Sequence, residues 1–270
     1  MKKYIFLGLK SLLAFLGYDL RIYNLRAAPN KDINLNIGAG GRQIPNFLSL
    51  DKFSLSYYSS LKTFEKHRIA YDIRADSLPF ENNEVANIYV SHVLEHIEDV
   101  YIEKFLSEAF RVLKPKAVLR IVSPDAEFLH RVSSFDNEYW SWRKDWANNP
   151  RHSSHTEKNY SQWDYFLAET LTPRMKFYRN YDNQEEFDYN QLKDDFRNVL
   201  QNISSIKYRD EFPQDHINFI FFEKIRGMGS TAGFSEVVNS KCQGSVSAAM
   251  QGPFFDQKAP QMSLYIDLVK

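Results

Sequence analysis

Short apolar runs separated by turn-forming residues recur from residue 33 onward, which is the pattern of β-strands in a sheet. Residues 100–113 instead carry apolar side chains at helical spacing, and Lys114-Pro115 ends that predicted helix. Alternating strands and helices predict an α/β fold, with a mostly parallel sheet and helices on its faces. We expect the strands at 33–37, 47–50, 68–73, 86–90, 118–122, 233–238 and 263–269.

The alternation stops between residues 126 and 212, a stretch rich in Trp, Tyr, Asn and charged residues. Helices are predicted there at 125–133, 160–170 and 187–202, and another follows at 220–232. We interpret 126–212 as an insertion that forms a lid over the substrate. Its aromatic and polar side chains suit a carbohydrate or other polar acceptor, and they suit an aromatic core equally well. They include Trp140, Trp142, Trp146, Arg151, His152, His155 and Trp163.

We divide the chain into an N-terminal segment of residues 1–30 and a main domain of residues 31–270. Lys2 and Lys3 precede an apolar stretch that Lys10 interrupts, and no small-residue cleavage site follows it. The helical spacing predicts an amphipathic helix, well short of the ~20 residues that span a bilayer. This helix either packs on the domain or brings residues 1–25 to a membrane surface. The protein is therefore expected in the cytoplasm, free or at the inner membrane face.

Composition excludes several classes of function. A length of 270 residues can bury a full core, and 34 basic side chains balance 34 acidic ones. This balance gives no general attraction to nucleic acid, so no nucleic-acid partner is expected. Cys242 is the only cysteine, which excludes an internal disulfide and a thiolate zinc site. Nothing in the composition indicates an oligomeric state.

A glycine cluster directly after the first predicted strand is the first candidate for ligand binding. Glycines there let the backbone turn sharply and approach a ligand closely. Asp51 ends the second strand, where its carboxylate can accept hydrogen bonds from the hydroxyls of a ribose. The interval from Gly38 to Asp51 is shorter than the ~20 residues usual in dinucleotide enzymes, and Arg42 stands where a third glycine would sit. Both features count against a nicotinamide cofactor.

Two further loops follow predicted strands and carry polar side chains. After the third strand, Asp72 and Asp76 compete for contact with the amine of an adenine, beside the apolar run 78–80. Either carboxylate also suits a solvated turn. After the fourth strand comes the run 91–96, Ser-His-Val-Leu-Glu-His, at the sheet edge where ligands of open α/β sheets bind.

Helical spacing places His92, Glu95 and His96 on one face. A His-x-x-Glu-His trio also suits a metal, but no companion ligand cluster is evident in the sequence, so no metal site is expected. His96 is interpreted as a residue that caps or braces the loop.

Taken together, these runs resemble the class I S-adenosylmethionine (SAM)-dependent methyltransferases, and most closely the branch associated with bacterial saccharide and cell-surface polysaccharide biosynthesis. The resemblance covers 33–125 and 213–270. It departs at Lys116-Ala117, which replaces a usual Gly-Gly pair, and at Asn36, which replaces the acid of most members. The matching runs are 35–51, 78–80, 91–96, 111–115, 121–125, 215–219 and 232–234.

The resemblance implies a Rossmann-like sheet of seven strands with the last one antiparallel, and SAM as the cofactor. It also implies O-methylation of a sugar or other small polar acceptor by in-line displacement. Two alternatives remain open: a non-catalytic SAM-binding or scaffold protein, and a nicotinamide-dependent oxidoreductase. The residues expected to bind the cofactor are Asn36, Gly38, Ala39, Gly40, Asp51, Asp76, Leu78 and Ser91.

A sugar hydroxyl is a poor nucleophile, so an imidazole within hydrogen-bond reach would assist its attack. The candidate bases are His92 and His216, with Glu95 or Asp215 orienting the ring. The alternative is that these histidines only pack or bind the acceptor.

Overall fold

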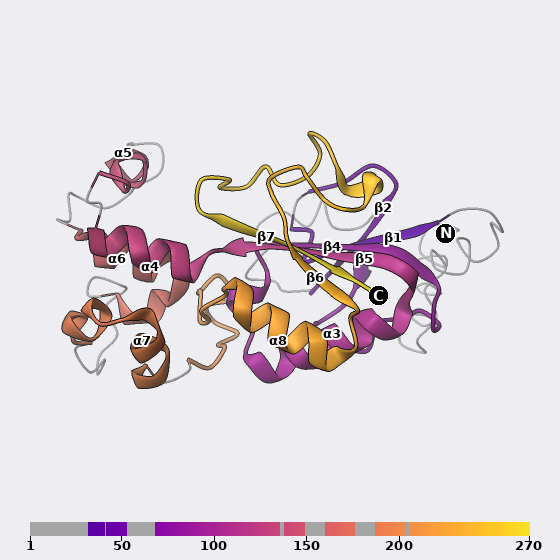
Figure 1. Cartoon of the computed structure of the whole chain (residues 1–270), viewed down its shortest axis with the longest axis horizontal. Helices are drawn as coiled ribbons and strands as arrows, with labels where there is room; N and C mark the ends of the chain where they lie inside the picture. The colour runs from indigo at the N-terminus through magenta and orange to yellow at the C-terminus, as the bar shows by residue number, and fades with distance from the viewer. Residues whose placement is uncertain are drawn as a thin grey trace, which may run out of the picture.

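The computed structural model describes residues 32–40, 42–52, 68–135, 138–148, 160–175, 187–203 and 206–270 (Figure 1). Its strands form one sheet in the order β3-β2-β1-β4-β5-β7-β6. β7 runs antiparallel to both of its neighbours, and the other paired strands run parallel. The prediction of a mostly parallel sheet with an antiparallel last strand is confirmed. The strands are β1 (Ile33–Ile37), β2 (Phe47–Asp51), β3 (Arg68–Ala70), β4 (Val85–Ser91), β5 (Leu113–Pro124), β6 (Glu236–Asn239) and β7 (Ser263–Val269).

Strand register brings the loops of interest to one edge of the sheet. Ile37 pairs with Leu50 of β2 on one side and with Val90 of β4 on the other. Ser91, the last residue of β4, pairs with Val122 near the end of β5. The segments that follow β1, β2 and β4 therefore emerge side by side, at the carboxyl ends where open α/β sheets bind ligands.

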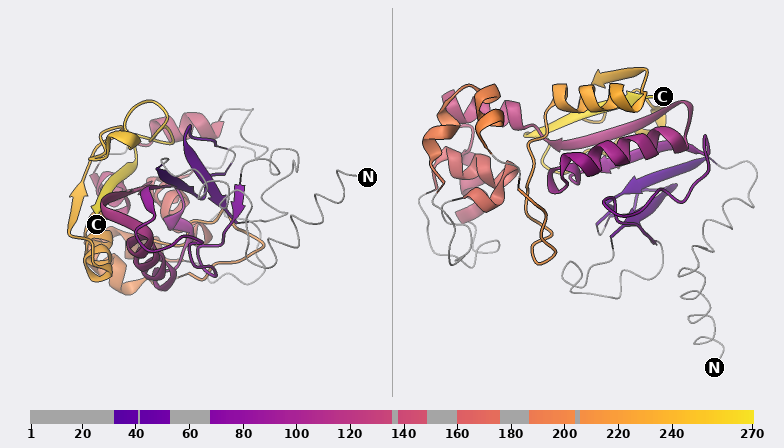
Figure 2. Two further views of the ribbon diagram at one scale, coloured as in Figure 1. Left: turned by 90° about the vertical axis from the view of Figure 1, so that its right-hand side faces the viewer. Right: turned by 90° about the horizontal axis from the view of Figure 1, so that it is seen from below.

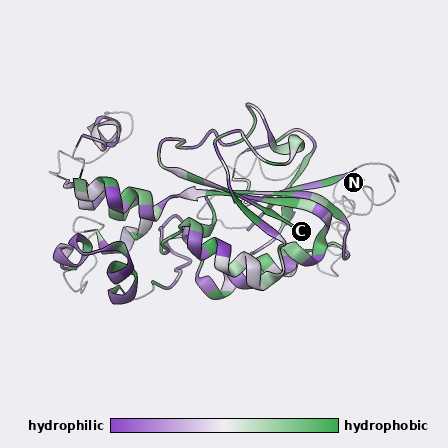
Figure 3. Ribbon diagram, in the orientation of Figure 1, coloured by the Kyte–Doolittle hydropathy of each residue, from purple (hydrophilic) through white to green (hydrophobic). Residues whose placement is uncertain are grey.

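Two helices cover one face of the sheet, α3 (Asp99–Val112) and α8 (Phe222–Ala232), and they lie next to each other in Figure 2. The apolar stripe of α3 packs into the main hydrophobic core, and Figure 3 shows both helices striped against largely apolar strands. Gly233 ends α8 with φ of 105°, a left-handed conformation that favours glycine. The other face is covered by the segment 240–262, which carries the short 3-10 helix η5 (Ala248–Met250).

The insertion forms a helical lobe beyond the carboxyl end of β5 (Figure 1). Trp140 and Trp163 are buried in its own aromatic core, which favours the packing alternative for these two side chains. The helix α5 was not predicted. Arg151, His152, His155 and the side chain of Trp146 lie outside the described residues. The elements are α4 (Ala126–Phe135), α5 (Ser141–Asn148), α6 (Gln162–Thr170), η3 (Thr172–Arg174), η4 (Tyr189–Lys193) and α7 (Phe196–Asn202).

The single helix predicted over 187–202 is wrong, since the segment divides into η4 and α7. Asp195 has a non-helical ψ of 141°, and its side chain accepts a hydrogen bond from the backbone N–H of Arg197. An aspartate in this arrangement begins a new helix rather than continuing an old one.

The N-terminal segment 1–30, with the prediction that residues 1–25 contact a membrane, lies outside the described residues. Within the described ranges, no helix has both the length and the apolar character needed to cross a bilayer.

Lys116, which replaces a usual glycine, adopts the left-handed backbone that a glycine would favour, with φ of 66°. Its N–H donates a hydrogen bond to the carbonyl of Lys270, at 2.9 Å. The backbone bond therefore ties the start of β5 to the end of the chain although the side chain is unfavourable there.

A buried arginine fastens the covering segment 240–262 to the sheet. The guanidinium of Arg120 is fully buried in β5, 2.6 Å from the carboxylate of Asp256 and 2.9 Å from that of Asp267. It also donates to the carbonyl of Lys241 at 2.8 Å. Asp267 lies on β7 and Asp256 in the covering segment, so one charged side chain joins the strand, its neighbour and the loop.

Replacing Arg120 by methionine should lower the free energy of unfolding by about 3–5 kcal/mol, because it leaves two buried carboxylates without their cation. Chemical denaturation measures this loss. The matched control is Arg226→Met, which removes an exposed pair with Glu223 and should change stability by less than about 1 kcal/mol. An equal effect of both substitutions would show that the buried network does not hold this face.

Candidate functional site

A pocket opens at the carboxyl edge of the sheet, where the loops after β1, β2, β3 and β4 meet Tyr208 and Pro213 of the returning chain. It encloses about 710 Å³, open solvent included. Because this figure includes open solvent, it is an upper bound on the space that the lining residues enclose. The pocket is built mainly by the loops that follow the strands predicted from the sequence.

The glycine cluster forms the floor of this pocket through a turn that only glycine suits. Gly38 and Gly40 have φ of 64° and 54°. A Cβ on Gly38 would lie 2.3 Å from Cγ2 of Val93, so a side chain there would collide with the β4 loop. The N–H of Gly38 donates to the carbonyl of Leu50 at 2.8 Å, which holds the turn against β2.

Asp51 lines the pocket from the end of β2. Its Oδ2 accepts a hydrogen bond from the N–H of Gly40 at 2.8 Å, so the carboxylate and the glycine turn fix each other. A carboxylate offers about four acceptor positions, which leaves capacity for ligand hydroxyls. The arrangement fits the ribose of SAM as the sequence predicts.

Between the two acids that compete for the adenine, Asp72 lines the pocket and Asp76 does not. Asp76 is exposed, and its Oδ2 accepts the N–H of Asp72 at 2.7 Å. Asp72 lies 3.2 Å from Nζ of Lys52. Burial raises the pKa of Asp72, but the backbone N–H of Arg74 and the charge of Lys52 outweigh it, so its pKa lies below the usual range.

The wall beyond Asp72 includes residues that sequence reasoning did not select. The guanidinium of Arg74 lies 3.4 Å from the ring centre of Tyr208, and Lys52 pairs with Asp210 at 2.8 Å. These contacts bring the end of the insertion over the β2 and β3 loops. No local pattern signals them, because Tyr208 and Asp210 follow Lys52 by more than 150 positions.

Four of the residues predicted to bind the cofactor support the pocket without lining it. Asn36 donates to the carbonyl of Arg42 at 3.4 Å. Leu78 is 2% exposed and belongs to the main core. The other two are Ala39 and Ser91, which adjoin the lining residues Gly38 and His92. Contact of these four with a ligand stays a prediction.

Next to the pocket lies a buried carboxylate, that of Glu95, which is 1% exposed. The hydroxyl of Ser123 donates to its Oε2 at 2.9 Å, and Nδ1 of His92 lies 3.2 Å from its Oε1. Burial raises the pKa of Glu95, but the interaction with His92 outweighs it, and the pKa lies below its usual range. The group therefore carries a negative charge in the interior.

His92 is held through Nε2 of its ring, while its buried Nδ1 makes no hydrogen bond among the described residues. Its Nε2 lies 3.2 Å from the carbonyl of Lys258 and 3.1 Å from Oγ of Ser263, and its Nδ1 faces Glu95. Its backbone adopts φ of 54°, a strained conformation for a residue with a side chain. The tertiary structure thus fixes the ring firmly, which suits a positioning residue.

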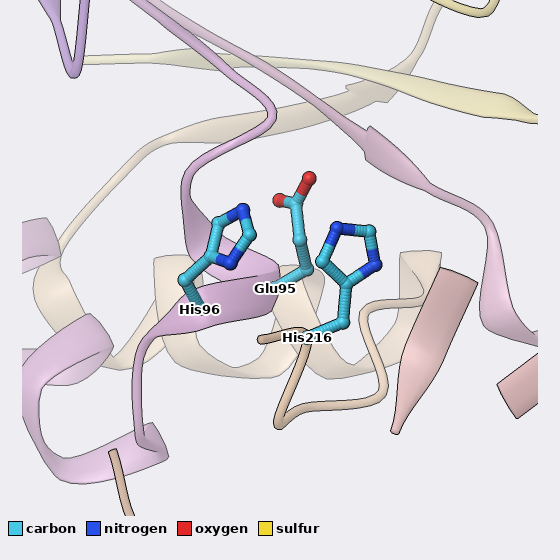
Figure 4. A group of neighbouring side chains, drawn as sticks. All are labelled: Glu95, His96 and His216. Atoms are coloured by element: carbon cyan, nitrogen blue, oxygen red, sulfur yellow. The ribbon is translucent and has the colours of Figure 1, made fainter. Parts of the chain in front are cut away.

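His216 comes to Glu95 from the far side of the insertion. Its backbone N–H donates to Oγ1 of Thr172 at 3.0 Å, and its carbonyl accepts the N–H of Thr172 at 2.9 Å. The N–H of Ile217 donates to the backbone carbonyl of Glu95 at 2.8 Å. Figure 4 shows the Glu95 side chain between the rings of His96 and His216.

The two flanking histidines are in contact, with ring centres 4.7 Å apart. Burial lowers the pKa of both rings, and that of His216 falls to about 3 because His96 adds to the effect. Both imidazoles are therefore neutral at physiological pH. Nδ1 of His96 lies 2.9 Å from the carbonyl of Asp215, whereas the carboxylate of Asp215 pairs with Arg209 at 3.1 Å.

The structure thus brings together the three residues predicted as catalytic: His92, Glu95 and His216. Of the two predicted orienting acids, Glu95 directs its carboxylate to His92, whereas the carboxylate of Asp215 pairs with Arg209. Ligand atoms of Glu95, His96 and His216 lie within 4.8 Å of one another, so this group could hold a metal ion. No metal site was predicted because no companion ligand cluster is evident in the sequence. The third residue, His216, follows His96 by 120 positions, and its proximity is visible only in the fold.

Comparison with known proteins adds a family match. Residues 46–121 match the Methyltransferase domain family, a stretch shorter than half of the chain that includes β2 to β4 and most of β5. No curated protein matches the chain.

Three solved structures are similar in fold. The SAM-dependent methyltransferase SibL in its apo form is 12% identical, with a TM-score of 0.42 over 91% of this chain and 53% of that one. The CurJ carbon methyltransferase is 16% identical, with a TM-score of 0.39 over 89% and 49%. A SAM-dependent methyltransferase from Mesorhizobium loti is 11% identical, with a TM-score of 0.41 over 92% and 96%. The chain spans about half the length of the SibL and CurJ structures, and likeness at this level carries no argument about substrates.

The family match covers Asp51 and the loops after β3 and β4, and the strand order and glycine turn complete the pocket around them. The residues present fit SAM, with a sharp glycine turn, an acid at the end of β2 and an open pocket between them. Residues 46–121 therefore match a methyltransferase domain, and the residues that line the pocket fit SAM as its cofactor.

Proposed function

We propose that this protein transfers the methyl group of SAM to a hydroxyl of a small polar acceptor, and that the acceptor is a saccharide. The observation that carries the proposal is the adjacency of the pocket to the buried group of Glu95, His92, His96 and His216, since His92 and His96 belong to both. The saccharide class is supported by the resemblance of the sequence motifs to the saccharide-biosynthesis branch.

SAM supplies an electrophilic methyl group on a sulfonium sulfur. The chain's own residues position the acceptor, exclude water and remove its proton. As the acceptor oxygen bonds to the methyl carbon, the carbon–sulfur bond breaks and the hydroxyl proton leaves. The buried group beside the pocket supplies imidazole nitrogens for this proton, and Glu95 together with Ser123 and His92 fixes the geometry of the group.

The helical lobe is proposed as the lid that sets acceptor specificity. Its returning segment carries Tyr208 onto the pocket and His216 onto Glu95. Both contacts support a role for the end of the insertion at the proposed acceptor side. A closing lobe would exclude water from the methyl transfer.

Removing the carboxylate of Asp51 should weaken SAM binding about 10- to 100-fold, because a hydrogen bond to a charged group contributes about 1.5–3 kcal/mol. Calorimetric titration of wild type, Asp51→Ala and the remote exposed control Glu236→Gln with SAM and with its demethylated product measures this. Wild-type affinity in Asp51→Ala would contradict the ribose contact. Failure of the folded wild type to bind either ligand would contradict the cofactor assignment.

The acid that contacts the adenine can be identified by a matched pair of variants. Asp72→Asn should weaken SAM binding about tenfold, since Asp72 lines the pocket, whereas Asp76→Asn should leave it within about threefold of wild type. The same calorimetric titration measures both. The reverse ranking would restore Asp76 as the adenine contact.

Acceptor class can be tested by incubating the protein and isotopically labelled SAM with matched sets of saccharides, phenols and amines. We expect label on a saccharide hydroxyl, detected by mass spectrometry, with stoichiometric release of demethylated SAM. Asp51→Ala serves as the control for enzyme-independent methylation. Label on amines or phenols but not on saccharides would contradict the proposed acceptor, and tight SAM binding without any product would favour the non-catalytic alternative.

A further inference from the structure

We propose that Glu95, His96 and His216 bind a divalent transition-metal cation beside the cofactor pocket. The group offers one carboxylate oxygen and two imidazole nitrogens within 4.8 Å of one another (Figure 4). Bonds of about 2.1 Å to a four-coordinate ion place ligand atoms about 3.4 Å apart. Small rotations of the three side chains therefore suffice to close the group around a cation.

The ring nitrogens are arranged as they are in metal-binding histidines. Nδ1 of His96 donates to the carbonyl of Asp215, which leaves the lone pair of Nε2 for a ligand bond. The ring of His216 makes a hydrogen bond to the backbone of Glu169, and its buried Nδ1 has no hydrogen-bond partner in the described part of the chain. A metal-binding imidazole typically donates its other N–H to a carbonyl or carboxylate in this way.

The charge at the group also favours a cation. Glu95 is 1% exposed, and its ion-pair partner among the described residues is His92 rather than a lysine or arginine. A buried carboxylate is costly unless it is compensated. Ser123 donates to one carboxylate oxygen and so orients the other, as the outer shell of a metal site does.

The donor set selects the class of ion. Mg²⁺ and Ca²⁺ prefer oxygen ligands throughout, whereas two imidazoles with one carboxylate suit Zn²⁺, Fe²⁺, Co²⁺ and related ions. Three protein ligands leave coordination positions open. Since His96 also lines the pocket, the site adjoins the space where the acceptor is expected.

The role of the cation rests on the proposed function. An acceptor hydroxyl that coordinates a divalent cation is a stronger acid than the free alcohol, so it can release its proton to solvent before the lobe closes over the site. The oxygen then bonds to the methyl carbon as the carbon–sulfur bond breaks. His216 on this view holds the cation and does not itself take the proton.

The experiment is a titration of the untagged full chain, first stripped with chelator, with Co²⁺ followed by its visible absorption, and then with Zn²⁺ by calorimetry. We expect one ion per chain with micromolar or tighter affinity. His216→Ala and Glu95→Gln should each weaken binding by at least about 100-fold, since they remove direct ligands. The matched control is His130→Gln, which removes a buried histidine that contacts the Leu192 carbonyl in the lobe and should retain the affinity.

No binding of Co²⁺ or Zn²⁺ to the folded wild type would overturn the proposal, as would unchanged affinity in His216→Ala or a preference for Mg²⁺. SAM binding by His216→Ala shows whether that variant is folded. If it is not, Ser123→Ala provides the second test, with a loss of about tenfold expected in Co²⁺ affinity and unchanged affinity overturning the proposal. The metal titrations need neither SAM nor acceptor. They therefore test the metal site even if the proposed methyl transfer is wrong.

Discussion

The burial of the Glu95 carboxylate is the constraint on which the rest of the site depends. A charged group that is 1% exposed must be compensated by partners on several elements. Ser123 at the end of β5, His92 at the end of β4 and His216 in the returning chain surround it. Each of these partners is held in turn by backbone contacts. The loop after β4 therefore cannot change conformation without disturbing β5 and the end of the insertion.

The same carboxylate explains why the segment that returns from the insertion, around His216 and Ile217, is fixed against the loop after β4. The hydrogen bond from Ile217 N–H to the Glu95 carbonyl fixes backbone to backbone, and the paired bonds between Thr172 and His216 fix the same segment to the lobe. The lobe and the sheet are thus joined at the buried carboxylate. A second junction, Arg74 against Tyr208, joins them at the cofactor pocket. Movement of the lobe would be transmitted to both places.

Sequence patterns predicted the sheet well because its signals are local. Short apolar runs predicted the strands in their order along the chain. The glycine turn and Asp51 could also be predicted as ligand-binding positions, because each lies at the end of a predicted strand and these two strands are neighbours in the sheet. The choice of Asp72 over Asp76 in the pocket lining depended on side-chain direction, which spacing alone does not show. The proximity of His96 to His216 depended on how 120 residues of intervening chain return, and no periodicity encodes that path.

The cofactor pocket and the proposed acceptor side therefore differ in how many amino-acid substitutions each can tolerate. Gly38 and Asp51 are fixed by the register of neighbouring parallel strands, so substitutions in the lobe leave them in place. The proposed acceptor side depends on the lobe, because His216 and Tyr208 both lie where the insertion returns to the sheet. Changes within the lobe core, such as a loss of packing at Trp140 or Trp163, reach the site only through this segment. A lobe with a different core can thus present a different acceptor surface while the cofactor cradle stays constant, provided that the partners of Glu95 are retained.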